Sequence, residues 1–589
     1  MTLPLLTELD KDQQKAVTFE TGPLLVHAGP GTGKTRVLVS RMAFLIHEKA
    51  ASPGQILAIT FTNQAAGEIS SRLQTILPPD TQNRVPLTCT FHGWAKRFLE
   101  KQRPGELPAI IDETEAAQIV SIAMRNSGIK GLKKRQVHKR ISLLKQQWPP
   151  STENESDEFV EIWERYHKFL REYNLMDYDD LILEANRILE QREAREELRR
   201  SLPFILVDEF QDVSPSQYSL VRLISPPDGN IMVIGDRHQS IYGFRGASPL
   251  FMDRFRQDFN RVTTISLKTC YRCPENFIRA AFSVVTPGDG MKMRARSTVK
   301  RKITLRSFAG VKSEASWIVR EIERITGGLS FDSINAGMAT GEPSESLGDI
   351  AILYRNSATG EPVARELEKR GIPFQHVKSR NPLASPDIRA IMRLWEISGN
   401  RRARYHTGIL HKETGISPED IRKFAQQHRN TSNPVLLQEI FDFLDIDSYA
   451  AEIQGLIKTV NAMPLENNLA ILLQKEADAL DINIEAVTLM SIHAAKGLEF
   501  PVIFITGCED GIIPWHDGDP DEERRIFYVA LSRASERLYI TWSKKRLTYG
   551  RYRQSAPSPI LSDIPGELLD ISEQKRKKRP GKPKQLKLF

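Results

Sequence analysis

Short runs of apolar, mostly β-branched residues recur along the chain between stretches that read as helices. Such runs are typical of strands buried on both faces, and their alternation with helices predicts parallel sheets covered by helices. The runs fall into two groups, residues 1–270 and residues 300–395 with 485–560. The sequence therefore predicts an α/β chain with two sheet-containing lobes. The predicted strands are Leu24–His27, Ile56–Phe61, Phe204–Val207, Ile231–Ile234, Ile350–Tyr354, Val487–Ile492, Val502–Thr506 and Leu538–Thr541.

Two regions interrupt this alternation. Residues 105–200 and 396–484 lack convincing strands and are rich in Glu, Arg, Lys and Leu, so each is predicted to be a helical insertion. A chain of 589 residues is too long for one ordinary domain. No stretch approaches the ~20 apolar residues that span a bilayer, and the N-terminus lacks the features of a signal peptide. We therefore expect a cytoplasmic protein.

The excess positive charge of the chain lies in a C-terminal tail. The net charge is +8, and residues 574–589 carry eight basic and no acidic side chains. The basic pI thus describes a disordered tail, and any binding of nucleic acid by the folded body must rest on specific residues. The four cysteines suit a reducing compartment. Cys270 and Cys273 have zinc-ligand spacing without a second pair, so we interpret them as buried thiols.

A glycine-rich turn follows the first predicted strand and precedes a helix. Backbone N–H groups of such a turn, with the positive end of the helix dipole, bind phosphates. Lys34 is predicted to reach the β- and γ-phosphates, and Thr35 to coordinate Mg²⁺. Ala28 stands where the strict pattern has glycine. The predicted phosphate-binding residues are Ala28, Gly29, Pro30, Gly31, Thr32, Gly33, Lys34, Thr35 and Arg36.

Two acids, Asp208 and Glu209, follow the predicted strand Phe204–Val207. The carboxyl ends of parallel strands are where ligands bind in open α/β sheets. Asp208 is predicted to hold Mg²⁺, and Glu209 to orient and deprotonate an attacking water. Together with the glycine-rich turn, this pair predicts a nucleoside triphosphatase, a class that also includes kinases, GTPases and transporters.

Further motifs narrow that class. Their order and approximate spacing, from residue 5 to about 569, resemble those of the UvrD/Rep-like DNA helicases of superfamily 1A. The motifs are Leu9–Val17, Thr60–Glu68, Val207–Asp212, Gly235–Ala247, Leu267 with Tyr271-Arg272, His493–Phe500 and Glu523–Ala534.

The resemblance implies two RecA-like lobes, each with a helical insertion. The first lobe would comprise residues 1–104 and 201–270, with insertion 105–200. The second would comprise 271–395 and 485–569, with insertion 396–484, followed by a tail at 570–589. It also implies ATP-dependent, 3′-to-5′ movement on single-stranded DNA and unwinding of duplex DNA, in repair, replication or recombination. Such a protein would act on the nucleoid.

The resemblance also assigns roles around ATP and Mg²⁺. Gln13 would bind the adenine edge, Tyr271 would stack on the base, and Glu499 would meet the ribose. Gln239 would sense the γ-phosphate. Arg272 and Arg533, from the second lobe, would act as arginine fingers that stabilise charge on the transferred phosphoryl group.

A motor that ignores base sequence needs stacking platforms and backbone contacts. Phe61, Phe244 and Trp515 match family positions that face single-stranded DNA, although histidine is usual at position 515. Ordinary core packing is the alternative for Phe61 and Phe244. The candidates for contacts with the DNA backbone are Thr60, Thr90, His92, Arg245 and His493.

Three further elements leave alternatives open. The basic segment Lys133–Arg140 could touch duplex phosphates or form a solvated helix face. Asp177-Tyr-Asp179-Asp180 resembles a metal cluster but is better interpreted as a helix N-cap with acids in the first turn. The insertion 396–484 is shorter than in familiar relatives. This length favours a rival hypothesis, a translocase that displaces proteins or remodels forks with little unwinding.

The chain ends Gln585-Leu586-Lys587-Leu588-Phe589. This peptide resembles the bacterial sliding-clamp-binding pentapeptide, in which Gln585, Leu586, Leu588 and Phe589 would be the anchors. Apolar residues on a disordered basic tether are typical of a segment that binds a partner groove. The alternative is an apolar end on a tail that binds DNA.

Overall fold

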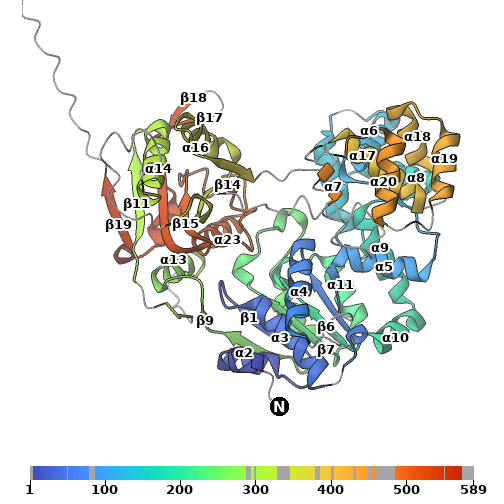
Figure 1. Cartoon of the computed structure of the whole chain (residues 1–589), viewed down its shortest axis with the longest axis horizontal. Helices are drawn as coiled ribbons and strands as arrows, with labels where there is room; N and C mark the ends of the chain where they lie inside the picture. Colours follow the sequence, from blue (N-terminus) through green and yellow to red (C-terminus); the bar gives the residue numbers. More distant parts are fainter. Residues whose placement is uncertain are drawn as a thin grey trace, which may run out of the picture. The chain divides into compact units, whose positions relative to one another are not determined.

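The computed structural model divides the chain into two compact units (Figure 1). The first contains residues 1–270 and 378–481, and the second contains 271–377 and 482–589. The residues described are 4–49, 51–77, 86–129, 131–286, 293–297, 300–327, 345–377, 385–399, 404–428, 431, 433–448, 450, 453–454, 456–457, 485–548 and 551–573.

The first unit is built on a six-stranded parallel sheet with the order β3-β2-β6-β7-β1-β8. Helices α2, α3 and α4 cover one face, and α5, α9, α11 and α12 cover the other. The strands are β1 (Leu24–Ala28), β2 (Ile56–Thr60), β3 (Leu87–Thr90), β6 (Phe204–Val207), β7 (Asn230–Gly235) and β8 (Thr263–Leu267). The helices are α2 (Lys11–Val17), α3 (Lys34–His47), α4 (Asn63–Ile76), α5 (Phe91–Gln102), α9 (Tyr178–Glu190), α11 (Pro215–Ile224) and α12 (Leu250–Asp258).

The second unit is built on a seven-stranded parallel sheet with the order β13-β14-β12-β15-β16-β11-β19. Its strands are β11 (Ile303–Phe308), β12 (Ile350–Tyr354), β13 (Phe374–Val377), β14 (Val487–Ser491), β15 (Phe500–Ile505), β16 (Ala534–Ser543) and β19 (Leu569–Glu573). Helices α14 (Val311–Ile325) and α16 (Ser357–Lys369) share a core with one face of the sheet. Helices α13 (Glu275–Val285) and α23 (Pro520–Leu531) pack against each other.

The predicted α/β class with two parallel-sheet lobes is confirmed. All eight predicted strands are present, and every residue of β2 and of β12 is buried, as expected for strands covered on both faces. The prediction missed β3, β8, β11, β13 and β19. Four of these are the edge strands of the two sheets, and β11 lies next to an edge. Edge strands need no continuous apolar run because one side remains accessible.

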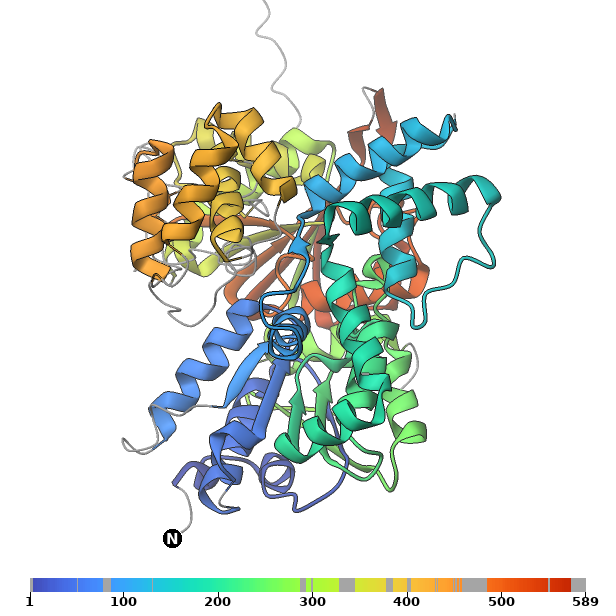
Figure 2. The ribbon, with the colours of Figure 1, turned by 90° about the vertical axis from the view of Figure 1, so that its right-hand side faces the viewer.

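The helices of the two predicted insertions share one hydrophobic core. They are α6 (Glu113–Ser127), α7 (Lys134–Lys145), α8 (Asp157–Tyr173), α17 (Pro386–Gly399), α18 (Arg404–Thr414), α19 (Pro418–Gln427) and α20 (Asn433–Leu444). Figure 2 shows α18–α20, in orange, beside α6–α8, in blue to teal. Arg393 is buried and forms an ion pair with the buried Glu115, with 3.2 Å between Nε and Oε1. Tyr405 packs edge-on against Phe169, at 6.1 Å between ring centroids.

The structure draws three boundaries differently from the sequence prediction. Helix α9, within the predicted insertion 105–200, packs in the core of the first sheet. Helix α17 begins at Pro386, inside the predicted lobe segment 271–395, yet its apolar face belongs to the core of the insertions. The predicted tail began at residue 570, but β19 continues to Glu573 and pairs with β11. A pattern of apolar residues identifies an element without showing which core it joins.

The acidic segment at the start of α9 is an N-cap, as predicted. The Asp177 side chain accepts from the backbone N–H of Asp180, and the Asp180 side chain accepts from the backbone N–H of Asp177. Lys145, fully buried, donates to both carboxylates at 2.7 Å. Burial and the Asp177 charge raise the pKa of neighbouring Asp179 to about 7. Among the described residues, no cluster of three or more His, Cys, Asp or Glu side chains could hold a metal ion.

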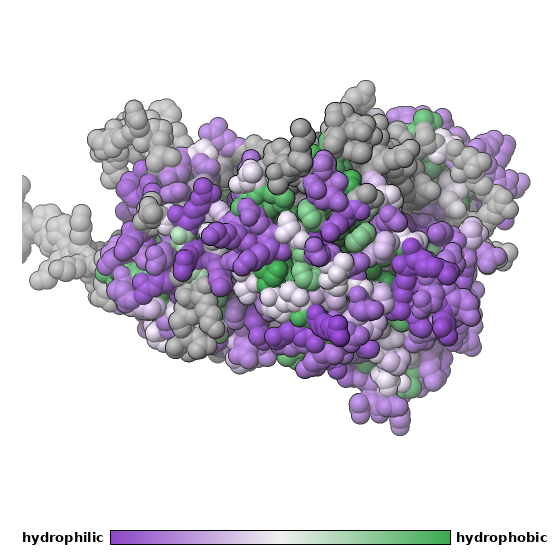
Figure 3. Space-filling model, turned by 90° about the horizontal axis from the view of Figure 1, so that it is seen from below, coloured by the Kyte–Doolittle hydropathy of each residue, from purple (hydrophilic) through white to green (hydrophobic). Residues whose placement is uncertain are grey.

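The remaining surface features are ordinary. On the face seen in Figure 3, hydrophilic side chains predominate and apolar ones form small areas. Within the described ranges, no helix has the length and apolar character needed to cross a membrane. Cys270 and Cys273 are fully buried thiols, which confirms their interpretation, and the Cys273 thiol donates to the carbonyl of Ser532.

Candidate functional site

The glycine-rich turn connects β1 to α3 in the first unit. Gly33 has φ +78° and a Cβ there would lie 3.0 Å from Nε2 of Gln13, so both backbone and space favour glycine. The Gln13 amide donates to the carbonyl of Thr32 at 2.9 Å and accepts from the backbone N–H of Asp10. Gln13, predicted to meet adenine, is thus buried against the glycine-rich turn. Arg36 in the first turn of α3 pairs with Glu8.

Asp208 and Glu209 extend from the carboxyl end of β6, next to β7 and one strand from β1. Lys34 Nζ lies 3.8 Å from Oε1 of Glu209. Glu209 has φ +47°, a conformation that non-glycine residues rarely adopt and that is common at functional sites. Burial and the charge of Glu209 raise the pKa of Asp208 to about 7. Two adjacent carboxylates of this kind are suitable oxygen ligands for Mg²⁺.

A buried amide joins these acids to the next loop. Gln211 donates to the carboxylates of Glu209 and Asp212, and its carbonyl oxygen accepts from the backbone N–H of Asp236 at 2.9 Å. Gly235 is required here because a Cβ would lie 2.4 Å from that oxygen. Gln239, almost fully buried, donates to Asp236 at 2.8 Å. The predicted phosphate sensor therefore belongs to the hydrogen-bonded group that holds Glu209.

The carboxyl ends of the neighbouring strands β2 and β3 carry a second group of predicted residues. Thr60 and Thr90 are directly paired in the parallel register of these strands. Both side chains are buried, and Thr90 caps α5 by accepting from the backbone N–H of Gly93. Phe61 and His92 follow them and are partly buried. One edge of one sheet therefore presents the phosphate residues on β1 and β6 and the predicted DNA residues on β2 and β3.

Three aromatic rings gather at this edge. Phe61 stacks on Tyr242 with 5.2 Å between centroids and 14° between ring planes, and Phe244 meets Tyr242 edge-on at 6.0 Å. The Arg245 guanidinium lies 5.6 Å from the centroids of both Tyr242 and Phe244. Phe244 is 46 % exposed, which argues against core packing. Burial and nearby Arg245 lower the pKa of His92 to about 4, so its imidazole is neutral at pH 7.

The second unit holds the other residues predicted to act on the nucleotide. Arg272 forms an ion pair with Glu499, and Arg296 lies over the Tyr271 ring at 5.5 Å. Arg533 is 1 % exposed, and its guanidinium donates to the carbonyls of Val529 and Leu498 at 3.1 and 3.2 Å. These carbonyls include the C-terminal end of α23, where a cation is stabilised.

Two predicted DNA residues also lie in the second unit. His493 follows β14, and Trp515 lies in the loop between β15 and α23; both are partly exposed. In the first unit, Lys133, Lys134, Arg135 and Lys139 are exposed on or next to α7, as both the duplex-contact and the solvated-face interpretations require. The predicted clamp-binding residues 585–589 lie outside the described residues.

The sequence reasoning missed the central ring of the aromatic group. Tyr242 lies in the motif Gly235–Ala247, two residues before Phe244, but the motif alone assigns it no role. Gln211 was also missed. Its position in the acidic motif was the available signal, and only the fold shows that it bridges β6 and β7.

Comparison with known proteins agrees with this geometry. Residues 9–260 match the model of the UvrD/REP helicase N-terminal domain, and residues 265–449 and 418–545 match that of the UvrD-like helicase C-terminal domain. A protein named ATP-dependent DNA helicase PcrA from Staphylococcus epidermidis is 30 % identical over 656 aligned residues, covering 96 % of this chain and 87 % of the relative. Its namesake from Staphylococcus aureus is 29 % identical over 655, with the same coverage. The chain belongs to the UvrD/REP helicase family.

Proposed function

We propose that this protein is a motor that hydrolyses ATP to move 3′-to-5′ along single-stranded DNA and to unwind duplex DNA. As a member of its family the chain is an ATP-dependent DNA helicase. The direction and the preference for a single strand are the proposed additions. The observation that carries the proposal is the shared sheet edge of the first unit, where the predicted phosphate residues follow β1 and β6, Phe61 follows β2, and the exposed Phe244 follows β7.

At the nucleotide, Lys34 would bind the β- and γ-phosphates, while Thr35 and Asp208 would hold Mg²⁺. Glu209 would accept a proton from the attacking water, which requires its carboxylate to be ionised. The contact between Gln211 and Glu209 fixes the direction of that carboxylate. Gln239 would report the γ-phosphate through Asp236 and Gln211 to the same group.

The second unit would contribute Arg272 and Arg533 to the phosphoryl group, Tyr271 to the base and Glu499 to the ribose. In this structure Arg272 is held by Glu499 and Arg533 by backbone carbonyls. Both cations are therefore already oriented by the second unit itself. A requirement for two cations from this unit would make its position depend on the γ-phosphate.

On the DNA side, Phe61, Tyr242 and Phe244 form a continuous aromatic surface with Arg245 beside it. Every base has a π-face, so stacking on such a surface is independent of base sequence. Thr60, Thr90 and His92 lie at or just after the carboxyl ends of β2 and β3 and would be the candidates of the first unit for contacts with the DNA backbone. His493 and Trp515 would be the candidates of the second unit. The loop from Asp236 to Arg245 runs from the nucleotide group to the aromatic group. This loop would connect ATP hydrolysis to the strength of DNA binding.

A second candidate function is translocation that displaces proteins or remodels forks with little unwinding. The observation that favours it is the core shared by α6–α8 and α17–α20, which makes the second insertion part of the first unit. A strand-displacement assay beside a protein-displacement assay separates the two functions. Displacement of bound protein without strand separation would support the second candidate.

The test of the leading proposal is unwinding of duplexes with a 3′ or a 5′ single-stranded tail. We expect unwinding from the 3′ tail alone, with ATPase activity stimulated by single-stranded DNA. The proposal would be refuted if single-stranded DNA does not stimulate the ATPase, or if unwinding occurs only from the 5′ tail.

The same assay with a bacterial sliding clamp tests the terminal peptide. We propose that Gln585, Leu586, Leu588 and Phe589 bind that clamp and direct the motor to DNA repair or replication.

A further inference from the structure

The loop that carries Trp515 is held at both ends by buried carboxylates. It runs from Thr506, after β15, to Asp519, before α23. Glu509 near its start is fully buried, and Glu523, which contacts its far end, is 2 % exposed. Glu509, a residue of the loop, binds Arg546 and the backbone N–H of Ser543 in β16. Glu523, in α23, binds Arg355 and the backbone N–H of Trp515 in the loop. The loop is therefore attached to the second unit at both ends through a carboxylate that is paired with an arginine.

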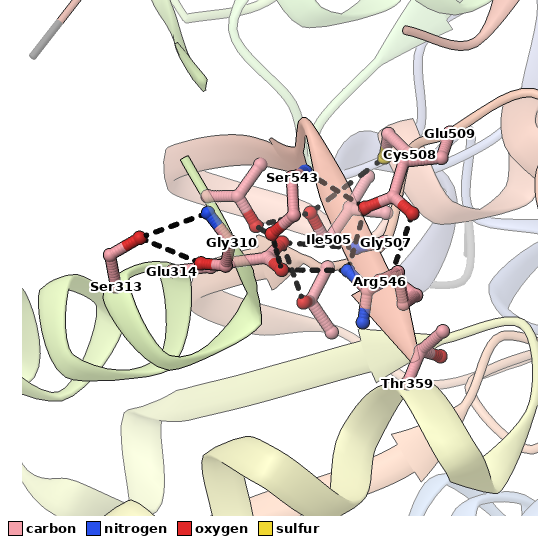
Figure 4. A network of polar contacts seen from close by, with 12 residues as sticks. Gly310, Ser313, Glu314, Thr359, Ile505, Gly507, Cys508, Glu509, Ser543 and Arg546 are labelled. Carbon is pink, nitrogen blue, oxygen red and sulfur yellow. Dashed lines mark hydrogen bonds and ion pairs between the residues drawn. The ribbon is translucent and has the colours of Figure 1, made fainter. Parts of the chain in front are cut away.

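At the start of the loop, Arg546 binds two carboxylates at once (Figure 4). Its Nε and Nη2 donate to Oε2 and Oε1 of Glu509, each at 2.7 Å, and Nη2 also donates to Glu314 at 2.7 Å. Glu509 accepts from the backbone N–H of Ser543 at 2.8 Å. Gly507 has φ +75°, and a Cβ there would lie 2.9 Å from the Thr359 methyl. The path of the chain out of β15 is thus closely defined.

At the far end, the backbone N–H of Trp515 itself donates to Oε2 of Glu523 at 2.8 Å. Arg355, which follows β12, holds that carboxylate from the other side, with Nη2 2.6 Å and Nε 3.1 Å from Oε1. Gly518 passes so close that a Cβ would lie 2.9 Å from Oε1. The indole remains partly exposed while its backbone is fixed.

Buried ion pairs are poor devices for stability, because removing two charges from water offsets most of their attraction. Their advantage is direction: a bidentate arginine fixes both the position and the plane of a carboxylate. Two such pairs under one surface loop therefore indicate that the geometry of the loop matters. A platform that is already in its binding conformation loses less entropy when it binds a ligand.

We propose that Arg355 and Glu523 are positioning residues that set the angle at which the Trp515 indole meets a base of single-stranded DNA. The Arg546–Glu314–Glu509 network holds the base of the same loop. This inference rests on the proposed function, in which Trp515 is a DNA contact. It assigns to Arg355 and Glu523 a role that is exerted through Trp515.

The experiment is a double-mutant cycle in the full-length protein with Glu523→Gln, Trp515→Ala and their combination. The measured quantities are the concentration of oligo-dT that gives half-maximal ATPase stimulation and the ATPase rate without DNA. Trp515→Ala should raise the half-saturating concentration about tenfold, the loss expected for one stacked base. Glu523→Gln should raise it by about threefold or more, and the double variant should equal Trp515→Ala. The rate without DNA should remain unchanged in Glu523→Gln.

Arg355→Lys provides a second route to the same result, because lysine keeps the charge but cannot hold both oxygens in one plane. If Glu523→Gln fails to fold, the same measurements on Arg355→Lys, alone and combined with Trp515→Ala, test the inference. The matched control is Arg365→Gln, which breaks an exposed pair with Glu361 on α16 and should change neither quantity.

The inference would be overturned if the fold-changes of Glu523→Gln and Trp515→Ala multiply in the double variant. It would also be overturned if neither Glu523→Gln nor Arg355→Lys changes the half-saturating concentration of oligo-dT. An unaltered half-saturating concentration in Trp515→Ala would also overturn it, since no platform would be left to position. A wild-type protein whose ATPase ignores oligo-dT would instead overturn the proposed function, so the two failures are distinguishable.

Discussion

Replacing Asp179 with asparagine is expected to stabilise the first unit increasingly as pH rises from about 5 to about 8. Asp179 lies in the first turn of α9, where Ser142 donates to it at 2.6 Å. Burial and the neighbouring Asp177 raise its pKa from 3.8 to about 7. Between pH 3.8 and about 7, Asp179 in the folded protein keeps a proton that the unfolded chain has already released. Wild-type stability from this group is therefore complete below pH 3.8 and is lost as pH rises toward 7.

The difference between 3.8 and about 7 corresponds to about 4 kcal/mol, at 1.36 kcal/mol per pKa unit. Asp179 is partly exposed, so solvent screening reduces the measurable part to about 1–2 kcal/mol between pH 5 and pH 8. Loss of a negative charge near the N-terminus of α9 costs about 0.5 kcal/mol and does not reverse the sign.

The assay is urea unfolding followed by far-UV circular dichroism at both pH values. Asp157→Asn is the matched control, because Asp157 is an exposed acid in the first turn of α8. The free-energy difference between Asp179→Asn and wild type should grow with pH, and the control should show no such growth. A constant difference, or a variant less stable than wild type at pH 8, would refute the reasoning.

Four further outcomes are expected. Glu209→Gln should lower ATP hydrolysis by at least about 100-fold while ATP still binds, measured by steady-state ATPase and by fluorescent-nucleotide titration. Tyr242→Ala should weaken binding of single-stranded DNA by about 1–3 kcal/mol in fluorescence anisotropy, because it removes the ring between Phe61 and Phe244. Arg546→Met should destabilise the second unit by about 3–5 kcal/mol in thermal unfolding, since it leaves two buried carboxylates unpaired. Deletion of residues 585–589 should abolish clamp binding in a pull-down and spare ATPase activity; unchanged clamp affinity would exclude the peptide.

The sequence predicted the parts of the fold that depend on local pattern. Strands in the sheet interiors were found because both faces are buried and the apolar run is continuous, as in β2 and β12. Edge strands such as β8, with alternating polar residues, gave no such signal. The start of α9 was predicted correctly because an N-cap is a local arrangement of Asp177 and Asp180.

Contacts between distant segments could not be predicted in this way. The N-cap acids also bind Lys145, and the carboxylate that holds Trp515 is held by Arg355, 168 positions before Glu523. A charged residue in a helical sequence pattern is predicted to lie on the solvated surface. Only the fold shows that it is buried. The phosphate-binding turn was identified because its motif is contiguous, whereas Tyr242 stacks on Phe61 only through the sheet topology.

Strands β13 and β14 are neighbours in the second sheet, yet residues 378–486 intervene, and the helices among them pack with α6–α8 of the other unit. A parallel pair is ordinarily joined by a crossover of about a dozen residues or more that returns to its own sheet. In this protein the chain returns to the second sheet only after helices that pack on α6–α8, and α6–α8 are synthesised some 200 residues earlier. Biogenesis should therefore be sequential: the N-terminal unit folds first, captures α17–α20, and only then closes the edge of the second sheet. Stalling translation before residue 487 should leave a folded first unit and an unpaired β13, a species that requires protection from aggregation.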